Sequence, residues 1–360
     1  VPGLVLGLAA GVWVDRFRRR PVLIVTDMGR ALLLLSIPGA TLVGDLTLTH
    51  LYLVAFGASV LTTFFNVAYL SYLPSIVSKE QILQANSRVS ASASVSEVAA
   101  FAAGGWLVQL FGAPTAVLID ATTFVASALF ILSIRRPEPT PELPVSPNLR
   151  REVTEGIRLI AGDRVQRALM QSSFLIEMSF WTMGAVYLFF ITKEIGVAPG
   201  LQGLIYSVGG ASSFAAAAIV PRISHRTSVG RALRLSIPIA AGGYLLTTFV
   251  RRPNFAGISL MVGQQLIGDS AAVIVEINTV SLRQTITPSR VLGRVNAAVT
   301  VANLLGRLLG SLIGGALGQY LGLRQAYVIG CVGMALAVFW FIPKRTRSAI
   351  DVIASGAKGS

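Results

Sequence analysis

The chain has 360 residues, of which 53% are hydrophobic and 13% are charged, whereas soluble globular proteins carry about 25% charged residues. Its net charge of +14 would suit nucleic acid, but the arginines stand in short clusters at the ends of long apolar runs, which argues against a nucleic-acid-binding face. The single cysteine, Cys331, excludes an internal disulfide and a cysteine metal cluster. The apolar runs are too long and too uniform for barrel strands, so we predict an all-α, multi-pass membrane protein.

A membrane-spanning helix needs about 20 apolar residues, and this rule predicts eleven spans. The first covers residues 1–14, and the charged turn GVWVDRFRRRP at Gly11–Pro21 separates it from the second. The other ten are predicted near residues 22–43, 51–76, 89–111, 114–134, 168–192, 201–221, 232–250, 254–282, 291–320 and 324–343. Both histidines, His50 and His225, fall in the loops between these spans, which argues against a metal site in the membrane.

A proline-rich stretch from Pro137 to Pro147 interrupts the spans and predicts a boundary. The expected parts are a helical bundle at 1–134, a cytoplasmic linker at 135–167, a six-helix bundle at 168–343 and a cytoplasmic tail at 344–360. Inside the linker, residues 148–167 predict an amphipathic helix that lies on the anionic inner membrane surface or serves as a solvated connector. Loops on one side of the predicted spans hold 24 of the 30 Lys and Arg residues, which places that side in the cytoplasm.

Internal similarity indicates a duplication. At an offset of 210 residues, Asn86, Gly104, Gly105 and Gln109 match Asn296, Gly314, Gly315 and Gln319. A second similarity pairs GRALLLLSIP from Gly29 with GRALRLSIP from Gly230. The matching order predicts a parallel repeat of six plus six helices, in which the helix at 168–192 has no partner and the first helix is missing.

Ionisable side chains inside the predicted spans are the candidates for a proton or substrate path, because each is costly in lipid unless it faces a cavity or a partner. These are Glu97, Asp120, Glu177, Asp269, Glu276 and Arg307, together with Asn66, which matches Glu276 under the offset. Glu97 matches Arg307 in the same way, which predicts opposite charges facing each other. Glu177 and Asp269 lie closest to mid-span and are preferred. The alternative for each residue is a structural ion pair or a position near the interface, which suits Asp120.

Glycines recur every fourth residue in two predicted helices, and small residues at that spacing let helix backbones approach closely. One series is Gly3, Gly7 and Gly11, and the other is Gly306, Gly310, Gly314 and Gly318.

The six-plus-six pattern, the proline-rich central loop and the motif G-x-x-x-D-R-x-x-R-R resemble the major facilitator superfamily. The motif residues are Gly11, Asp15, Arg16, Arg19 and Arg20. DRFRRRP, LPSIVSKEQILQANSR and VLIDATTFVASAL are similar to the branch of macrolide-efflux and siderophore-export proteins, although its common Gly-Pro pair is here Ala99–Phe101. The resemblance implies that Asp15 caps the positive end of a helix starting around Thr287 and Pro288, and that the second glycine series lies against the first helix.

We therefore expect a secondary transporter in the cell (inner or plasma) membrane that exports amphipathic small molecules by alternating access. Protons and lipid are the expected partners, with no cofactor, and the chain is expected to act as a monomer. No G-x-x-x-x-G-K-[ST] loop is present, so ATP-driven transport would need another chain. No catalytic constellation suggests an enzyme. The alternatives are a lipid or lysophospholipid transporter and a non-transporting sensor or assembly partner.

Overall fold

The computed structural model describes residues 17–77, 82–134, 149–226 and 228–341, and every regular element within these ranges is a helix. Nine of the described helical segments are long and apolar enough to cross a membrane, and a shorter apolar helix covers Val98–Phe111. The predicted all-α, multi-pass class is therefore confirmed. The span predicted at 1–14 lies outside the described residues.

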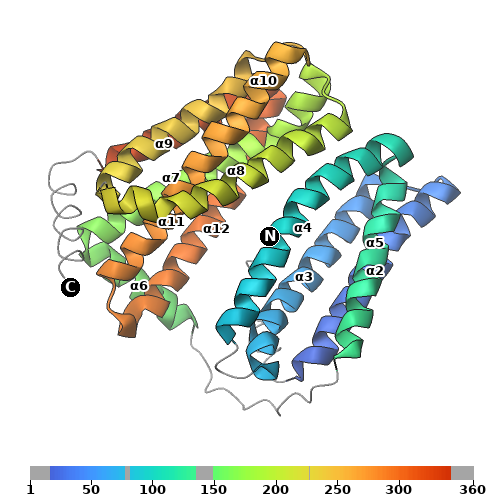
Figure 1. Ribbon diagram of the computed structural model, residues 1–360, viewed down its shortest axis with the longest axis horizontal. Coiled ribbons are helices and arrows are strands. Elements are labelled where there is room, and N and C mark those ends of the chain that lie inside the picture. Colours follow the sequence, from blue (N-terminus) through green and yellow to red (C-terminus); the bar gives the residue numbers. More distant parts are fainter. Residues whose placement is uncertain (1–16, 78–81, 135–148, 227, 342–360) are drawn as a thin grey trace. The chain divides into compact units, whose positions relative to one another are not determined.

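The chain forms two compact units, Val1–Ser96 with Ala103–Asn148, and Glu97–Ala102 with Leu149–Ser360. In the first unit, α2 packs along both α3 and α5 (Figure 1). Gly44 ends α2 and Gly112 joins α4 to α5, and both adopt positive φ angles that favour glycine. The helices of this unit are α2 (Arg19–Val43), α3 (Leu48–Ile76), α4 (Ile82–Phe111) and α5 (Ala113–Ser133).

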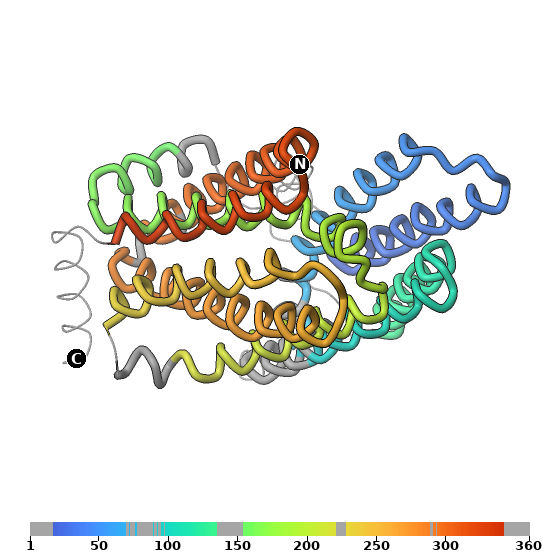
Figure 2. Tube along the Cα trace, turned by 90° about the horizontal axis from the view of Figure 1, so that it is seen from above, coloured from blue at the N-terminus to red at the C-terminus, as the bar shows by residue number. Residues whose placement is uncertain are grey.

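In the second unit, α7 packs with α12 and α13, and α11 packs with α8 and α9, which gives the two rows of helices seen from above in Figure 2. Met183, Tyr244, Met261 and Tyr327 belong to the buried core that joins these rows. The elements are α6 (Leu149–Gly162), α7 (Arg164–Phe189), η2 (Phe190–Ile195), α8 (Pro199–Arg226), α9 (Val229–Leu245), η3 (Leu246–Phe249), α10 (Phe255–Gln264), η4 (Gln265–Asp269), α11 (Ser270–Ile286), α12 (Ser289–Tyr320), α13 (Leu323–Leu336) and η5 (Ala337–Phe341).

The second glycine series forms the contact between α12 and α7. A Cβ atom placed on Gly306 would meet the carbonyl oxygen of Phe174, and one placed on Gly310 would meet that of Met178. A Cβ atom on Gly314 would likewise meet the carbonyl oxygen of Thr182, and one on Gly318 would meet the Val186 side chain. The described partner of this series is α7, which the sequence did not predict. The expected contact with the first helix involves residues outside the described ranges and stays a prediction. Sequence spacing shows that a helix face is smooth but does not show which helix covers it.

The amphipathic helix of the linker, α6, lies against the start of α12. Ile160 is fully buried in a cluster with Val295, Ala298 and Val299, and Gly156 sits directly over the backbone of α12. Glu155 and Arg294 form an ion pair of 3.0 Å beside this contact. Neither expectation for this helix anticipated that contact. An apolar helix face suits lipid and another helix equally well, and Gly156 permits the close approach to α12.

We expect Gly156→Leu to detach α6 from α12, because its side chain would overlap the α12 backbone at Arg294. Limited proteolysis should then cut the segment joining α6 to α7 faster than in the wild type. Gly162→Ala is the matched control, since a Cβ atom at Gly162 meets nothing within 4 Å. Equal cleavage of the wild type and both variants would contradict this docking.

Two arginines bind helix-terminal carbonyl groups, one in each unit. Arg20 at the start of α2 donates to the carbonyls of Ile131 (3.2 Å) and Leu132 (2.6 Å) near the end of α5. Arg324 at the start of α13 donates to the carbonyls of Thr248 and Val250 after α9. The last carbonyls of a helix have no partner within the helix, so these guanidinium groups supply the missing donors.

Arg324→Gln is expected to lower the free energy of unfolding by about 1–3 kcal/mol, because two carbonyls lose a charged donor. The guanidinium also lies 4.9 Å from the Phe190 ring and 3.6 Å from Glu194, and the substitution removes both contacts. Heating purified protein and measuring the monodisperse fraction by gel filtration checks this. Arg251→Gln, at an exposed position, serves as the control. Identical melting of the two variants would rule out the proposed role.

The histidines differ from expectation. His50 lies in the first turn of α3, where its ring nitrogen is 2.8 Å from the Ser36 hydroxyl, and His225 lies in the last turn of α8. Both helices extend a few residues further than hydropathy indicates, because Thr47 caps α3 and polar residues continue the end of α8.

Candidate functional site

Glu177 of α7 and Arg307 of α12 form a bidentate ion pair near the middle of both helices. The Arg307 Nε and Nη2 atoms each donate to a Glu177 carboxylate oxygen at 2.9 Å. The glycine contact between α12 and α7 creates this geometry, because Glu177 precedes Met178 and Arg307 follows Gly306, the residues where the two backbones approach. Close helix packing and charge pairing therefore occur at the same level of the bundle.

The pair is not sealed from its surroundings. The Arg307 side chain is 47% exposed and that of Glu177 is 22% exposed. Glu276 of α11 is also exposed, and its charge acts on Arg307. Two carboxylates thus act on one guanidinium, and a proton on Glu177 would favour the attraction of Arg307 to Glu276.

Asp269 forms a second site at the end of the π-helical turn η4. Its Oδ1 atom accepts a 2.8 Å hydrogen bond from the Tyr244 hydroxyl of α9. Its Oδ2 atom lies against Gly209 of α8, where any larger residue would collide with the carboxylate. The span predicted at 254–282 is thus two α-helical pieces joined by a π turn, a feature that is frequent at functional sites.

A chain of buried side chains extends from the same turn. Gln264 accepts hydrogen bonds from Tyr187 (2.9 Å) and Thr247 (3.3 Å) and donates to Gln265 (2.6 Å). Gln265 in turn donates to the carbonyl of Ile205 at 3.2 Å. Sequence reasoning missed these glutamines because it considered only ionisable groups. Two adjacent glutamines inside an apolar run were the available signal, since a buried amide needs partners.

Phe180 connects the two sites. It lies one turn after Glu177 on α7, and its ring centroid is 6.0 Å from that of Tyr244, the residue that binds Asp269. Tyr187, one heptad further along α7, contacts the rings of Tyr206 (6.0 Å) and Tyr327 (5.5 Å). Phe180 therefore lies one turn from Glu177 and in contact with the tyrosine that binds Asp269, within the second unit. Asp269 and Glu276 have different neighbours, although seven residues separate them.

The remaining candidates are less connected. Asn66 of α3 and Asp120 of α5 are exposed in the first unit. Glu97 is in α4, but its side chain lies outside the described residues, as do Gly3, Gly7, Gly11, Asp15 and Arg16. Of the motif residues, Arg19 and Arg20 lie in the first turn of α2, and Arg20 binds α5 as described above. The pairing of Glu97 with Arg307 and the roles of Gly11, Asp15 and Arg16 remain predictions.

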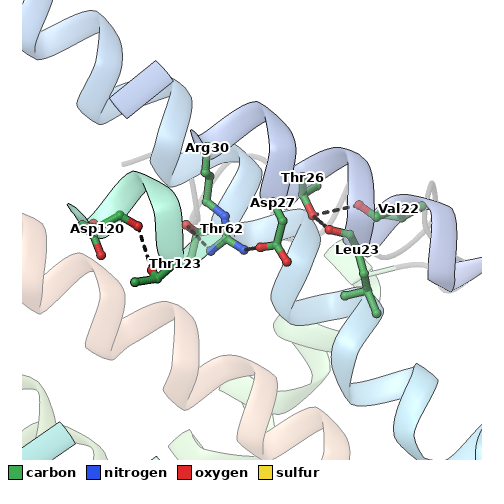
Figure 3. Close-up of polar contacts among 8 residues, drawn as sticks. All are labelled: Val22, Leu23, Thr26, Asp27, Arg30, Thr62, Asp120 and Thr123. Atoms are coloured by element: carbon green, nitrogen blue, oxygen red, sulfur yellow. Dashed lines mark hydrogen bonds and ion pairs between the residues drawn. The ribbon is translucent and has the colours of Figure 1, made fainter. Parts of the chain in front are cut away.

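Sequence reasoning also passed over a buried pair in α2. Asp27 and Arg30 bind each other, with 1% and 8% of their surfaces exposed (Figure 3). A carboxylate followed three residues later by an arginine, inside an apolar helix, was a sufficient signal for an intrahelical ion pair.

Thr287 does not cap α12 as expected. The helix begins at Ser289 after Pro288, and the Thr287 hydroxyl accepts a hydrogen bond from Gln166 and donates to the Arg283 carbonyl. Pro288 lies just before the helix because proline lacks the N–H group but favours this backbone geometry. Among the described residues, no group of three or more His, Cys, Asp and Glu side chains could hold a metal ion.

Comparisons with known proteins agree with this architecture. The profile of the Major Facilitator Superfamily matches residues 1–286. The uncharacterized MFS-type transporter YfiS of Bacillus subtilis (strain 168) is 26% identical over 353 residues, which cover 96% of this chain and 82% of YfiS. The crystal structure of a point mutant of the nucleoside transporter NupG superposes with a TM-score of 0.72 at 13% identity, covering 95% of this chain and 90% of NupG.

A bacterial homologue of the iron transporter ferroportin, in its inward-facing state, gives a TM-score of 0.69 at 17% identity and covers 95% of this chain and 88% of the homologue. These structural likenesses show the fold, and the profile match covers well over half of the sequence. The chain belongs to the Major Facilitator Superfamily, whose members are membrane transporters.

Proposed function

We propose that this transporter couples the export of amphipathic small molecules to the proton gradient across the cell membrane. The observation that carries the proposal is the Glu177–Arg307 pair, which joins α7 to α12 inside membrane-spanning helices. An ion pair at this depth is costly unless it is matched closely, and such pairs mark ion pathways in membrane proteins.

A proton provides a simple way to open the pair. A protonated Glu177 no longer attracts Arg307 as an anion, and Glu276 offers the guanidinium another carboxylate. The partial exposure of all three side chains supports access of the proton to the site. Opening and closing this contact would change how α12 is held against α7, and so bias the second unit between the states of alternating access.

The chemistry beside the pair supports an amphipathic cargo. Phe180 is 43% exposed one turn from Glu177, so an aromatic face and a carboxylate lie on the same stretch of α7. Such a surface suits a flat apolar molecule that carries a positive charge. The export direction rests on the resemblance of DRFRRRP and the neighbouring motifs. NupG is a nucleoside transporter and ferroportin is an iron transporter, so the shared fold itself selects no cargo.

Ethidium, a flat amphipathic cation, is a suitable probe for this proposal. Inside-out membrane vesicles containing the full chain and energised to an acidic interior should accumulate ethidium, and a protonophore should abolish the accumulation. Accumulation that survives the protonophore would contradict proton coupling. If the vesicles move a fluorescent lysophospholipid but not ethidium, the lipid-transport alternative replaces the proposed cargo.

A further inference from the structure

A second group of charges lies in the first unit, away from the residues used above. Along the whole length of α2, α3 and α5, the Asp, Glu, Lys and Arg residues beyond the initial Arg19 and Arg20 are Asp27, Arg30 and Asp120. Arg30 lies eleven residues after the start of α2, or about 16 Å along the helix axis, which is mid-span. Asp27, Arg30 and Asp120 are called the triad below.

The guanidinium group of Arg30 is the centre of the triad. It binds Asp27 on its own helix and Thr62 of α3 at 3.4 Å (Figure 3). It also lies 4.4 Å from the centroids of the Phe65 and Phe124 rings. Both rings lie within cation–π distance of the guanidinium and favour its present position. The position of Arg30 is therefore fixed by α2, α3 and α5 together.

Asp120 of α5 is the second carboxylate of the triad. Its charge acts on Arg30, and its backbone carbonyl accepts the hydroxyl of Thr123 at 2.7 Å. Asp120 is exposed, whereas Asp27 is 1% exposed. Among the described side chains, α3 also brings Tyr69 near, and its ring stacks on that of Phe65 with centroids 6.0 Å apart. Hydroxyls, rings and one guanidinium thus surround the two carboxylates among the described residues.

The charges of the triad do not balance. One guanidinium faces two carboxylates, which leaves a net charge of −1 at mid-span when both are ionised. The Oδ2 atom of Asp27 is buried without a hydrogen-bond donor among the described residues, and the Nε atom of Arg30 is buried without an acceptor there. A net charge in this setting is unfavourable, and a single bound proton removes it.

We propose that the triad is a second proton-binding site of this transporter, with Asp120 as the residue that carries the proton. With the proton on a carboxylate oxygen of Asp120, Asp27 and Arg30 form the neutral pair that the structure shows. When that O–H bond breaks and the proton leaves, the ionised Asp120 carboxylate adds a second negative charge near Arg30. The exposed carboxylate exchanges protons, while the buried Asp27 remains the permanent partner of Arg30.

This inference extends the proposed proton coupling, but its test does not measure transport. The full chain in phosphatidylcholine and phosphatidylglycerol nanodiscs, labelled with carbon-13 at its aspartate carboxyl groups, is studied by infrared difference spectroscopy. An Asp269→Asn background removes the membrane aspartate that lies outside the triad, so Asp27 and Asp120 are the aspartates left within the described spans. We expect a protonated-carboxyl band, shifted by the label, in neutral buffer, and its loss in strongly alkaline buffer.

Asp120→Asn should remove this band, whereas Asp45→Asn should leave it unchanged, because Asp45 is exposed in the turn after α2. Two outcomes would overturn the proposal. One is a band that persists when Asp120→Asn is added to the Asp269→Asn background, and the other is the absence of a labelled band in the Asp269→Asn protein itself. The second outcome needs no folded Asp120 variant. If ethidium accumulation does not depend on the proton gradient but the carboxyl band is present, the proposed function is wrong and the proton-binding site remains supported.

Discussion

Gly310→Leu is expected to prevent stable assembly of the second unit. A Cβ atom at this position already overlaps the carbonyl oxygen of Met178, and a leucine side chain has no room to turn away from α7. Overpacking a tight contact typically costs about 1–3 kcal/mol, and a clash with backbone lies at the upper end or beyond it because backbone cannot rotate aside. The measurement is the yield and thermal stability of the purified protein, followed by gel filtration.

Gly315→Ala is the matched control for this substitution. Gly315 lies on the same helix five residues later, and a Cβ atom there meets nothing within 4 Å. Replacing a helical glycine by alanine without a clash favours the helix by about 1 kcal/mol. We therefore expect Gly315→Ala to be neutral or slightly stabilising. If Gly310→Leu and Gly315→Ala unfold at the same temperature, the glycines do not form the contact between α12 and α7.

Glu177→Gln is expected to abolish most gradient-driven accumulation of ethidium while leaving the protein folded. Removing one partner of a fully buried pair costs about 3–5 kcal/mol, but exposed pairs are worth only about 0.2–1 kcal/mol. Because the Arg307 side chain is 47% exposed, the loss in the free energy of unfolding should lie near the range for exposed pairs. We expect gradient-driven uptake in vesicles to fall at least about tenfold, equivalent to about 1.4 kcal/mol.

The exchange Glu177→Arg with Arg307→Glu separates pairing from position. If only the ion pair between α7 and α12 matters, the double variant should recover stability relative to Glu177→Arg alone. Coupling should not recover fully, because the carboxylate then sits on α12. Full recovery of both properties would contradict the role assigned to Glu177.

The fold follows from the sequence because hydrocarbon tolerates little besides helices. Apolar runs of sufficient length mark the spans from 22–43 to 324–343 closely, and most boundaries lie within a few residues of the observed helices. Exceptions have local causes. Asp163 caps α7 by accepting from the Gln166 amide, so the helix starts at Arg164 and not at 168.

The site was harder to predict, because hydropathy shows where a charge lies but not what it contacts. Glu177 and Asp269 were identified as costly residues, yet their partners Arg307 and Tyr244 depend on which helices pack together. The π turn at Gln265–Asp269 has no signature in a hydropathy pattern. The contact of the second glycine series with α7 was missed for the same reason, because glycine spacing does not show which helix packs against it. Its expected contact with the first helix involves residues outside the described ranges and stays a prediction.

Proton movement driven by the probe itself tests the central claim most directly. In proteoliposomes of the full chain containing a trapped pH-sensitive dye, we expect added ethidium to change the internal pH. Glu177→Gln should abolish that change while radiolabelled ethidium still exchanges across the membrane. An equal pH change in the wild type and in Glu177→Gln would show that the Glu177–Arg307 pair does not couple protons to transport.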